Sequence, residues 1–415
     1  MPPTASRVSR QAPARDRRTL VPASRRRPAQ PRATTSARTR NRALRSLRRA
    51  GPALAGYVTV RLLGVLVVAK WAHLKHHGLW TTLATSWDSD WYLGIAEHGY
   101  TDSLGTEYNA NNLAFFPLYP ALVKAVAAVT PGSRATIGLL VAIGCSLLAA
   151  WGVFAVGERL YGRRAGTVLV VLWGSMPVAL VQWMGYTESL FTALAAWSLY
   201  AVLTGRWLWA GTLAALAGLT RPTGIAVAAA VSVTAAVVVW RRWRTERTVP
   251  STILAGGLLA PLGWLGYVVW VGLRVGRWDG YFAVQKLWFN EWDGGADTLR
   301  AMRRHLAYES MPQLFLVVVT VVLIASAGLF LLSLADRQPL PLLVFTGVLL
   351  VIVLGSGGVY FPRARFLLPG FPLLLPLALG VARARGHVAL VVLGAAALSS
   401  VYFGGYMALV WPSAP

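Results

Sequence analysis

Residues 87–100 have the sequence WDSDWYLGIAEHGY, which concentrates acidic residues in a chain that is otherwise mostly apolar. Trp87, Trp91 and Ile95 recur at every fourth position and therefore share one face of a helix. A helix with an apolar face and an acidic face lies in the membrane interface rather than across the bilayer. The stretch predicts an interfacial helix.

The two aspartates of this helix point in different directions. Asp88 and Asp90 are separated by about 200° around a helix of 3.6 residues per turn. They cannot both face one target, so we expect one carboxylate to act in a site and the other to support it. The alternative is that Asp88, or Ser86, caps the N-terminus of the helix.

The composition of the whole chain is that of a polytopic integral membrane protein. Of its 415 residues, 56% are hydrophobic and 13% are charged, whereas soluble proteins average about 25% charged residues. The 18 tryptophans suit rings placed at the bilayer interfaces. The single cysteine, Cys145, excludes a disulfide framework and a cysteine-based metal site.

Residues 1–50 differ from the rest because they hold 15 arginines and a single acid, Asp16. With few large apolar residues they cannot form a core, which predicts a disordered tail. Nucleic-acid binding is one alternative for such a tail. A basic cytoplasmic arm that lies on anionic membrane lipid is the better interpretation, with no nucleic acid as partner.

Residues 51–415 are expected to form one transmembrane domain of about eleven helices. An N-terminus inside the cell places the arginine-rich turns in the cytoplasm and the C-terminus outside. Most acids then fall in two long outer loops, 75–135 and 276–312, so that any chemistry faces outward. The predicted spans are 52–74, 136–157, 166–182, 187–204, 207–220, 222–240, 252–275, 313–334, 340–356, 366–383 and 388–411.

The apolar stretch FFPLYPALVKAVAAV (115–129) is short and contains Pro117 and Pro120. If it crossed the membrane, every later helix would be inverted and the arginine-rich turns would lie outside. We therefore expect an interfacial or re-entrant helix within the first outer loop.

Three further motifs place charged side chains at outer helix ends. GYTESLF (185–191) puts Glu188 at a helix start, where Thr187 could instead act as a cap. LTRPTG (219–224) puts Arg221 between two spans, and YFPRARFLLP (360–369) puts Arg363 and Arg365 outside. Outer arginines oppose the positive-inside trend, and an anionic ligand at the membrane surface explains them better than chance does.

Glu97 and His98 form an adjacent acidic and basic pair near the end of the first stretch. A lone histidine without a second one at ligand spacing indicates a hydrogen-bonded structural residue rather than a metal ligand. No metal and no cofactor is predicted.

Taken together, these motifs resemble those of the GT-C glycosyltransferases. WDSDWYLGIAEHGY, NNLAFFPLYPAL (111–122), GYTESLF, LTRPTG and RARFLLPGFPL occur in the family's order over about residues 60–380. Among GT-C enzymes they are most similar to the second mannosyltransferase of GPI-anchor assembly (PIG-V) and its bacterial relatives. The resemblance implies a GT-C-type bundle of about 11 transmembrane helices with interfacial helices in the first outer loop.

The resemblance also implies roles for individual residues. Asp88 matches the aspartate of the family's W-D motif and would be the catalytic base, with Asp90 ranked second. Arg221 and Arg365, with Arg363 beside them, would hold the donor phosphate. Glu97, His98 and Tyr100 match the IAEHGY block and would shape the site, as would Glu188.

The resemblance implies an inverting mannosyltransferase of a bacterial cell membrane with an extracytoplasmic active site. Its donor would be polyprenyl-phosphate-mannose, and its acceptor a glycan, a lipid or a protein. The rival interpretation is a transporter or flippase of a lipid-linked sugar. Transporters keep binding groups near the bilayer midplane, often between inverted repeats, whereas here the ionisable residues cluster at helix ends and no repeat is found.

Overall fold

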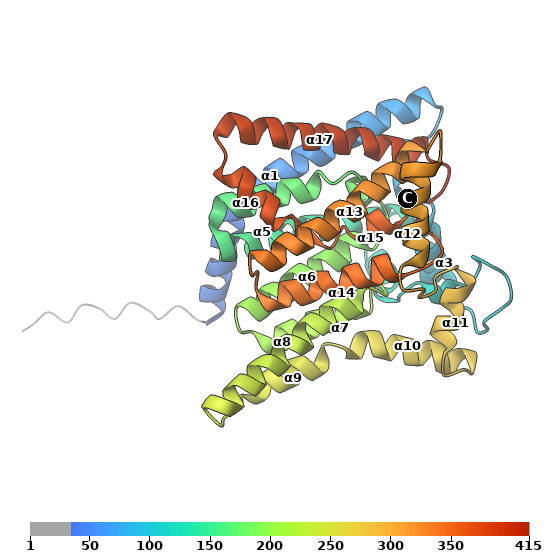
Figure 1. The fold of residues 1–415 in the computed structure, drawn as a ribbon. Helices are drawn as coiled ribbons and strands as arrows, with labels where there is room; N and C mark the ends of the chain where they lie inside the picture. Colours follow the sequence, from blue (N-terminus) through green and yellow to red (C-terminus); the bar gives the residue numbers. More distant parts are fainter. Residues whose placement is uncertain (1–34, 415) are drawn as a thin grey trace, which may run out of the picture. The chain divides into compact units, whose positions relative to one another are not determined.

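The computed structural model describes residues 35–414, which are almost entirely helical (Figure 1). No strand occurs within this range, which confirms the prediction of an all-α protein. Its elements are α1 (Thr35–Leu74), α2 (Leu79–Ala84), α3 (Asp88–His98), η1 (Asn112–Ala114), α4 (Leu118–Ala127), α5 (Arg134–Gly174), η2 (Ala179–Trp183), α6 (Glu188–Leu203), α7 (Trp207–Gly218), α8 (Gly224–Thr245), α9 (Ser251–Leu259), α10 (Leu262–Val275), α11 (Gly280–Leu287), α12 (Ala296–Arg303), η3 (Arg304–Tyr308), α13 (Leu314–Ala335), α14 (Leu340–Gly355), α15 (Arg363–Phe366), η4 (Phe371–Leu374), α16 (Leu375–Arg383) and α17 (Gly386–Leu409).

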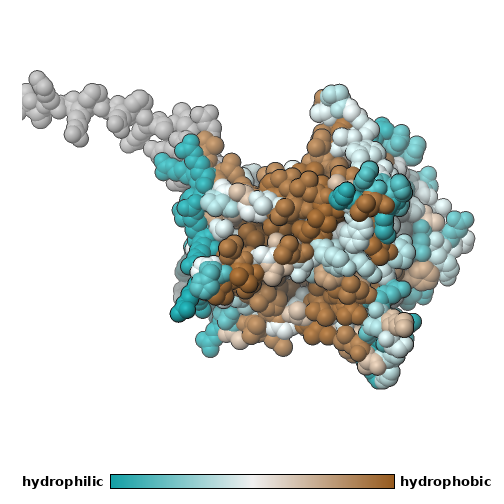
Figure 2. All heavy atoms as spheres, turned by 90° about the horizontal axis from the view of Figure 1, so that it is seen from above, coloured by the Kyte–Doolittle hydropathy of each residue, from teal (hydrophilic) through white to brown (hydrophobic). Residues whose placement is uncertain are grey.

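Long apolar helices identify an integral membrane protein. Figure 2 shows an apolar surface bordered by hydrophilic residues on two opposite sides, as a bilayer-spanning bundle requires. In the part of the chain that the structure describes, five shorter apolar helices accompany the long ones, among them Leu118–Ala127 in the predicted interfacial stretch. Within the described residues, six stretches are long and apolar enough to cross a membrane: Leu44–Leu74, Arg134–Gly174, Gly224–Thr245, Ser251–Val275, Leu314–Ala335 and Gly386–Leu409.

All eleven apolar runs of the sequence are helical in whole or in part. Two of them lie in α5, where Gly162 has a φ of 87° and interrupts the helix. A Cβ atom on Gly157 would lie 2.8 Å from the Cα of Gly166, so the two halves of α5 pack against each other as a hairpin. The number of membrane crossings stays a prediction.

Prolines divide three of the predicted spans. The run 166–182 is α-helical only to Gly174, because Pro177 cannot continue the hydrogen-bond ladder, and its last residues belong to η2. Pro261 separates α9 from α10 in the same way. The run 366–383 is divided at Pro369, which lies between α15 and η4. Pro372 and Pro376 lie in the first turns of η4 and α16, where a proline is tolerated.

The predicted disordered tail covers residues 1–50, and its part before residue 35 lies outside the described residues. Thr35–Ala50, by contrast, is helical as the first part of α1, and the domain boundary at residue 50 stays a prediction. This segment contains no glycine or proline, and its alanine, leucine and arginine residues are good helix formers. Ala50 is buried, and Arg49 pairs with Glu158 at 2.8 Å.

The two predicted outer loops contain helices of their own and meet at one end of the bundle, where Figure 1 places α3, α11 and α12. The backbone N–H of Asn109 in the first loop donates to the carbonyl of Leu287 in the second at 3.1 Å. The N–H of Gly357, beyond α14, donates to the carbonyl of Glu291 at 2.6 Å. These bonds bring three chain segments together around one space.

Arg61 is a buried cation in α1 that the sequence analysis did not single out. Its guanidinium donates to the carbonyl of Gly174 at the end of α5 and, at 2.9 Å, to the hydroxyl of Ser400 in α17. That hydroxyl donates onward to the carbonyl of Met176 at 2.8 Å. A charge inside a membrane protein is retained only where such partners satisfy it. Arg61 therefore fixes the start of the segment that leads from α5 to α6.

Candidate active site

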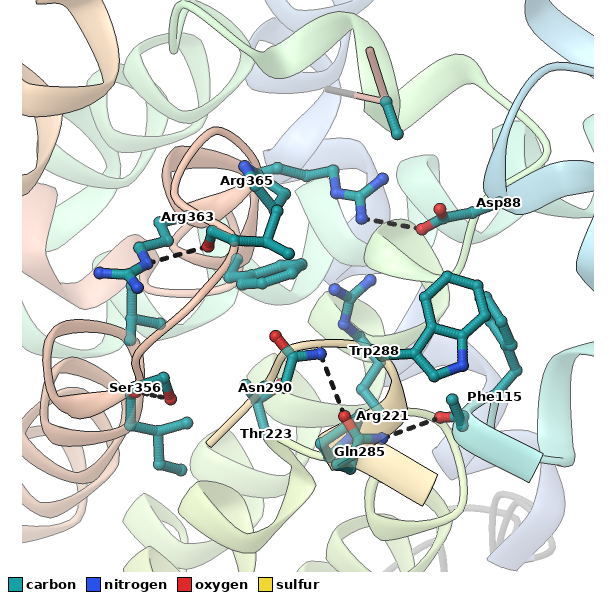
Figure 3. Close-up of a pocket in the computed structure, with 18 of the residues that line it drawn as sticks. Asp88, Phe115, Arg221, Thr223, Gln285, Trp288, Asn290, Ser356, Arg363 and Arg365 are labelled. Carbon is teal, nitrogen blue, oxygen red and sulfur yellow. Dashed lines mark hydrogen bonds and ion pairs between the residues drawn. The ribbon is translucent and has the colours of Figure 1, made fainter. Parts of the chain in front are cut away.

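A cavity of about 490 Å³ opens where the loop segments meet (Figure 3). Its walls come from α3, the segment 109–116, the turn 220–223, the residues 285–290 and the segment 352–366. Figure 3 shows Arg363, Arg365 and Asp88 on one side of the space and the amides of Gln285 and Asn290 on the other, with Arg221 and Trp288 between them. This division determines what the cavity can bind.

The charged part is a chain of alternating ion pairs. The Asp88 carboxylate lies 2.8 Å from the Arg365 guanidinium, which is 3.2 Å from the Glu188 carboxylate. Glu188 in turn lies 2.6 Å from Arg221. The Glu188 side chain is 1% exposed, whereas that of Asp88 is 19% exposed at the edge of the cavity. Of the two acids, Asp88 is the one that a ligand could reach.

Asp88 reaches this position because α3 begins against the segment before α6. The N–H of Gly185 donates to the carbonyl of Leu83 at 2.9 Å. A Cβ atom on Gly185 would lie 3.0 Å from the hydroxyl of Ser89, so a glycine is needed for this close approach. Trp87, just before the helix, has a φ of 53°, a strained conformation of the kind found at functional sites.

The capping alternatives are wrong for both acidic motifs. The N-cap residue of α3 is Trp87, while the Ser86 hydroxyl donates to the carbonyl of Thr81 at 3.1 Å and the Asp88 carboxylate pairs with Arg365. Thr187, the N-cap residue of α6, makes no capping hydrogen bond through its side chain. The Thr187 hydroxyl instead accepts a hydrogen bond from Arg221 at 2.9 Å and lies 3.1 Å from the Tyr92 hydroxyl. Thr187 and Tyr92 thus hold Arg221 against Glu188.

Arg221 and Arg365 are also held by aromatic rings and by the local backbone. The Arg365 guanidinium lies 5.0 Å from the ring centre of Tyr186, and both arginines lie near the ring of Phe366, at 5.4 and 5.3 Å. The turn that carries Arg221 is fixed where Leu118 N–H donates to the carbonyl of Leu219 at 2.9 Å. Such guanidinium–ring contacts are strongest where water is excluded.

Arg363 has a different environment from the other two arginines. It is 2% exposed, it donates to the carbonyl of Val359 at 3.2 Å and to the hydroxyl of Thr298, and it lies 5.3 Å from the ring of Tyr360. Among the described residues, no carboxylate lies within ion-pair distance of it, and its Nη2 atom has no hydrogen-bond partner. Burial lowers the pKa of Arg363. An anion in the cavity would compensate this buried charge.

The neutral part of the lining was missed by the sequence analysis. Trp288 is fixed by a hydrogen bond of 2.9 Å from its indole N–H to the carbonyl of Asn111 and packs edge-on against Phe115. Asn290 donates to the amide oxygen of Gln285 at 3.2 Å. These residues lie in QKLWFN (285–290), whose amides on either side of a tryptophan in an outer loop were the available signal.

The remaining predicted site residues lie elsewhere. Asp90 is exposed and outside the cavity lining, and partial burial of its carboxyl raises its pKa. Glu97 pairs with Arg134 at 2.9 Å on the surface, and His98 is exposed. Tyr100 donates to the carbonyl of Phe115 at 2.8 Å and so supports the cavity wall from behind. Of the two aspartates, Asp88 lines the cavity and Asp90 does not.

Comparison with known proteins finds one family model that matches part of the chain. Residues 116–270 match the family model of dolichyl-phosphate-mannose-protein mannosyltransferases (PMT_2). This match, over about a third of the chain, and the all-helical fold agree with the resemblance of the sequence motifs to the GT-C glycosyltransferases. The PIG-V family among them stays a prediction. No curated protein matches the chain.

Among solved structures, the chain is similar to the oligosaccharyltransferase AglB of Archaeoglobus fulgidus. In its complex with an inhibitory peptide and a dolichol-phosphate, that enzyme is 14% identical with a TM-score of 0.47, over 85% of this chain and 55% of the enzyme. In its complex with Zn and sulfate, the same enzyme is 14% identical with a TM-score of 0.47, over 86% of this chain and 53% of the enzyme. The chain spans about half the length of these structures.

The ion-pair chain predicts that Glu188 is a main determinant of stability. Glu188→Gln leaves two buried guanidiniums without their shared counter-charge, which costs about 3–5 kcal/mol when a buried pair is broken. We expect a clear fall in the melting temperature of the purified protein. Glu97→Gln is the matched control, because an exposed pair contributes only about 0–1 kcal/mol. Equal melting temperatures for the two variants would contradict the role of Glu188.

Proposed function

We propose that the protein transfers a sugar from a polyprenyl-phosphate donor to an acceptor hydroxyl in this cavity. The observation that carries the proposal is the Asp88 carboxylate at the cavity edge, with Arg221, Arg363 and Arg365 in the same lining. Mannose is the proposed sugar, since the matching family model describes mannosyltransferases and the sequence motifs resemble the PIG-V family. The acceptor is a glycan, a lipid or a protein with a free hydroxyl.

In the proposed reaction Asp88 is the general base. One of its oxygens, Oδ2, is held by Arg365, which leaves Oδ1 to accept the proton of the acceptor hydroxyl. The acceptor oxygen forms a bond to C1 of the sugar as the bond from C1 to the phosphate oxygen breaks. The configuration at C1 inverts, and the lipid phosphate leaves as an anion. A general base of this kind contributes typically about 10²–10⁴-fold to the rate.

The three arginines differ in how much positive charge each can offer to the donor phosphate. Arg221 and Arg365 already share the charges of Glu188 and Asp88, so little of their positive charge is uncompensated. Arg363 has a buried Nη2 atom without a hydrogen-bond partner, as Arg365 has at Nη1. Of the three arginines, however, Arg363 is the one with no carboxylate within ion-pair distance among the described residues. We therefore rank Arg363 first as the phosphate ligand, ahead of the two arginines that the sequence motifs favour. Charge-assisted bonds to the leaving phosphate stabilise its developing charge.

The neutral wall suits the sugar. Trp288 and Phe115 offer apolar ring surface, and Gln285 and Asn290 offer amide groups that can donate to and accept from hydroxyls (Figure 3). The proposed reaction requires no metal and no cofactor.

Asp88→Asn tests the assignment of the base. The amide cannot take a proton, so transfer from radiolabelled polyprenyl-phosphate-mannose in membranes should fall by about 10²-fold or more. Asp90→Asn is the matched control, because Asp90 is exposed on the other side of the same helix, and it should keep most of the activity. Near-normal transfer by Asp88→Asn would overturn the assignment.

Arg363→Gln tests the phosphate ligand. Losing a hydrogen bond to a charged group costs about 1.5–3 kcal/mol, so the donor KM should rise by about 10–100-fold while the acceptor KM stays close to the wild-type value. Arg277→Gln is the control, because Arg277 pairs with Asp279 on an exposed outer turn. A donor KM that does not change would exclude Arg363 from the phosphate site.

The proposed orientation puts the cavity outside a bacterial cell membrane and the N-terminus inside. Introduced cysteines report the side of a turn, because the native Cys145 is buried. Thr106→Cys, near the cavity, should react with a membrane-impermeant maleimide in intact cells. Thr248→Cys, in the turn between α8 and α9, should react only after the cells are permeabilised. The opposite labelling pattern would invert the proposed orientation.

A further inference from the structure

A second hollow lies at the opposite end of α8 from the active-site cavity. It has a volume of about 430 Å³ and lies between the last turns of α8 and the facing side of α9. Ligand sites typically measure about 300–1,000 Å³. This one is walled by apolar side chains, notably Trp240 and Trp243 of α8 and Leu254 and Leu258 of α9. We refer to it as the α8–α9 groove.

The groove faces outward from the bundle and is fixed in shape. Trp240 and Trp243 are 53% and 63% exposed, and Leu258 is 72% exposed. At the base of the groove the Ser232 hydroxyl donates to the carbonyl of Gly257 at 2.7 Å. A Cβ atom on Gly257 would lie only 2.9 Å from that of Ala235, so the two helices touch there. In an integral membrane protein, an exposed apolar groove of this kind holds hydrocarbon.

Arginines border the same groove. Arg241, Arg242, Arg244 and Arg247 are exposed at the end of α8 and in the turn that follows. Arg242 pairs with Glu246 at 3.6 Å, which is the one ion pair of this cluster among the described residues. The Arg244 guanidinium lies 4.3 Å from the ring centre of Trp240, which is itself a wall of the groove. An excess of positive charge therefore lies directly beside the apolar hollow.

We propose that the α8–α9 groove is a binding site for one anionic phospholipid. An acyl chain fills the hollow, and the phosphate lies at Arg244, with the other arginines of the turn around it. The groove and the arginines lie at a similar level along α8. The groove-lining residues from Ala236 to Trp243 lie within about 15 Å of the end of this helix at 1.5 Å per residue. Tryptophans beside arginines at this level are typical of a membrane interface. The proposal does not depend on the proposed transferase activity.

Native mass spectrometry of the full-length protein, released from vesicles of dioleoylphosphatidylcholine and dioleoylphosphatidylglycerol at 3:1, tests the site. The wild type should retain one phosphatidylglycerol in clear excess over its share in the vesicles. Arg244→Gln should reduce this retention by about fivefold, the effect of one arginine at an anionic membrane surface. Retention of both lipids in proportion to the vesicle composition would overturn the proposal.

Two further variants separate the groove from general surface charge. Ala236→Trp fills the groove from an exposed position, so it should abolish the retained lipid while the melting temperature stays unchanged. Arg383→Gln combined with Arg385→Gln removes two exposed arginines from another basic turn and should retain the lipid. If the double variant loses the lipid and Ala236→Trp keeps it, surface charge alone explains the binding and the groove is not a site.

Soluble glycerol phosphate should not displace the lipid, because it has no acyl chain. Displacement of the lipid by glycerol phosphate would contradict the role of the groove.

Discussion

The carboxylate of Glu188 lies between two guanidiniums in a place that water hardly reaches. Burying one unpaired charge costs several kcal/mol, so the three side chains are stable there only together. They come from three distant parts of the chain: the start of α6, the turn between α7 and α8, and α15. The position of each of these segments therefore depends on the other two, and the cavity wall depends on all three.

The ion pairs also determine how Asp88 is presented. The Arg365 guanidinium contacts the buried Glu188 and, at the cavity edge, Asp88. Because Glu188 fixes this guanidinium, the guanidinium in turn fixes the Asp88 carboxylate. Two acids and two arginines balance one another, and Arg363 remains as the cation without a carboxylate partner among the described residues. The cavity thus combines a neutralised, rigid wall with one separate positive charge, and a neutral amide and aromatic wall completes it.

Helical geometry was enough to predict several of these features. The 200° between Asp88 and Asp90 separated a cavity residue from an exposed one, and the charge pattern grouped Arg221, Arg363 and Arg365 on the side of Asp88. Gln285, Trp288 and Asn290 were not predicted, because no periodicity distinguishes them and only tertiary contacts place them in the cavity. Arg61 was hidden inside an apolar run, and its partners at Gly174 and Ser400 are far away in sequence.

The pairing of Asp88 with Arg365 also determines when the site can form during synthesis of the chain. Arg365 follows Asp88 by well over half of the chain, and ribosomes add about 5–20 residues per second. Asp88 therefore emerges tens of seconds before its partner, whereas Glu188 is followed after 33 residues by Arg221 and lacks only its second guanidinium. Until Arg365 is synthesised, the Asp88 carboxylate has to stay hydrated. The active site is therefore completed only when α15 has been synthesised.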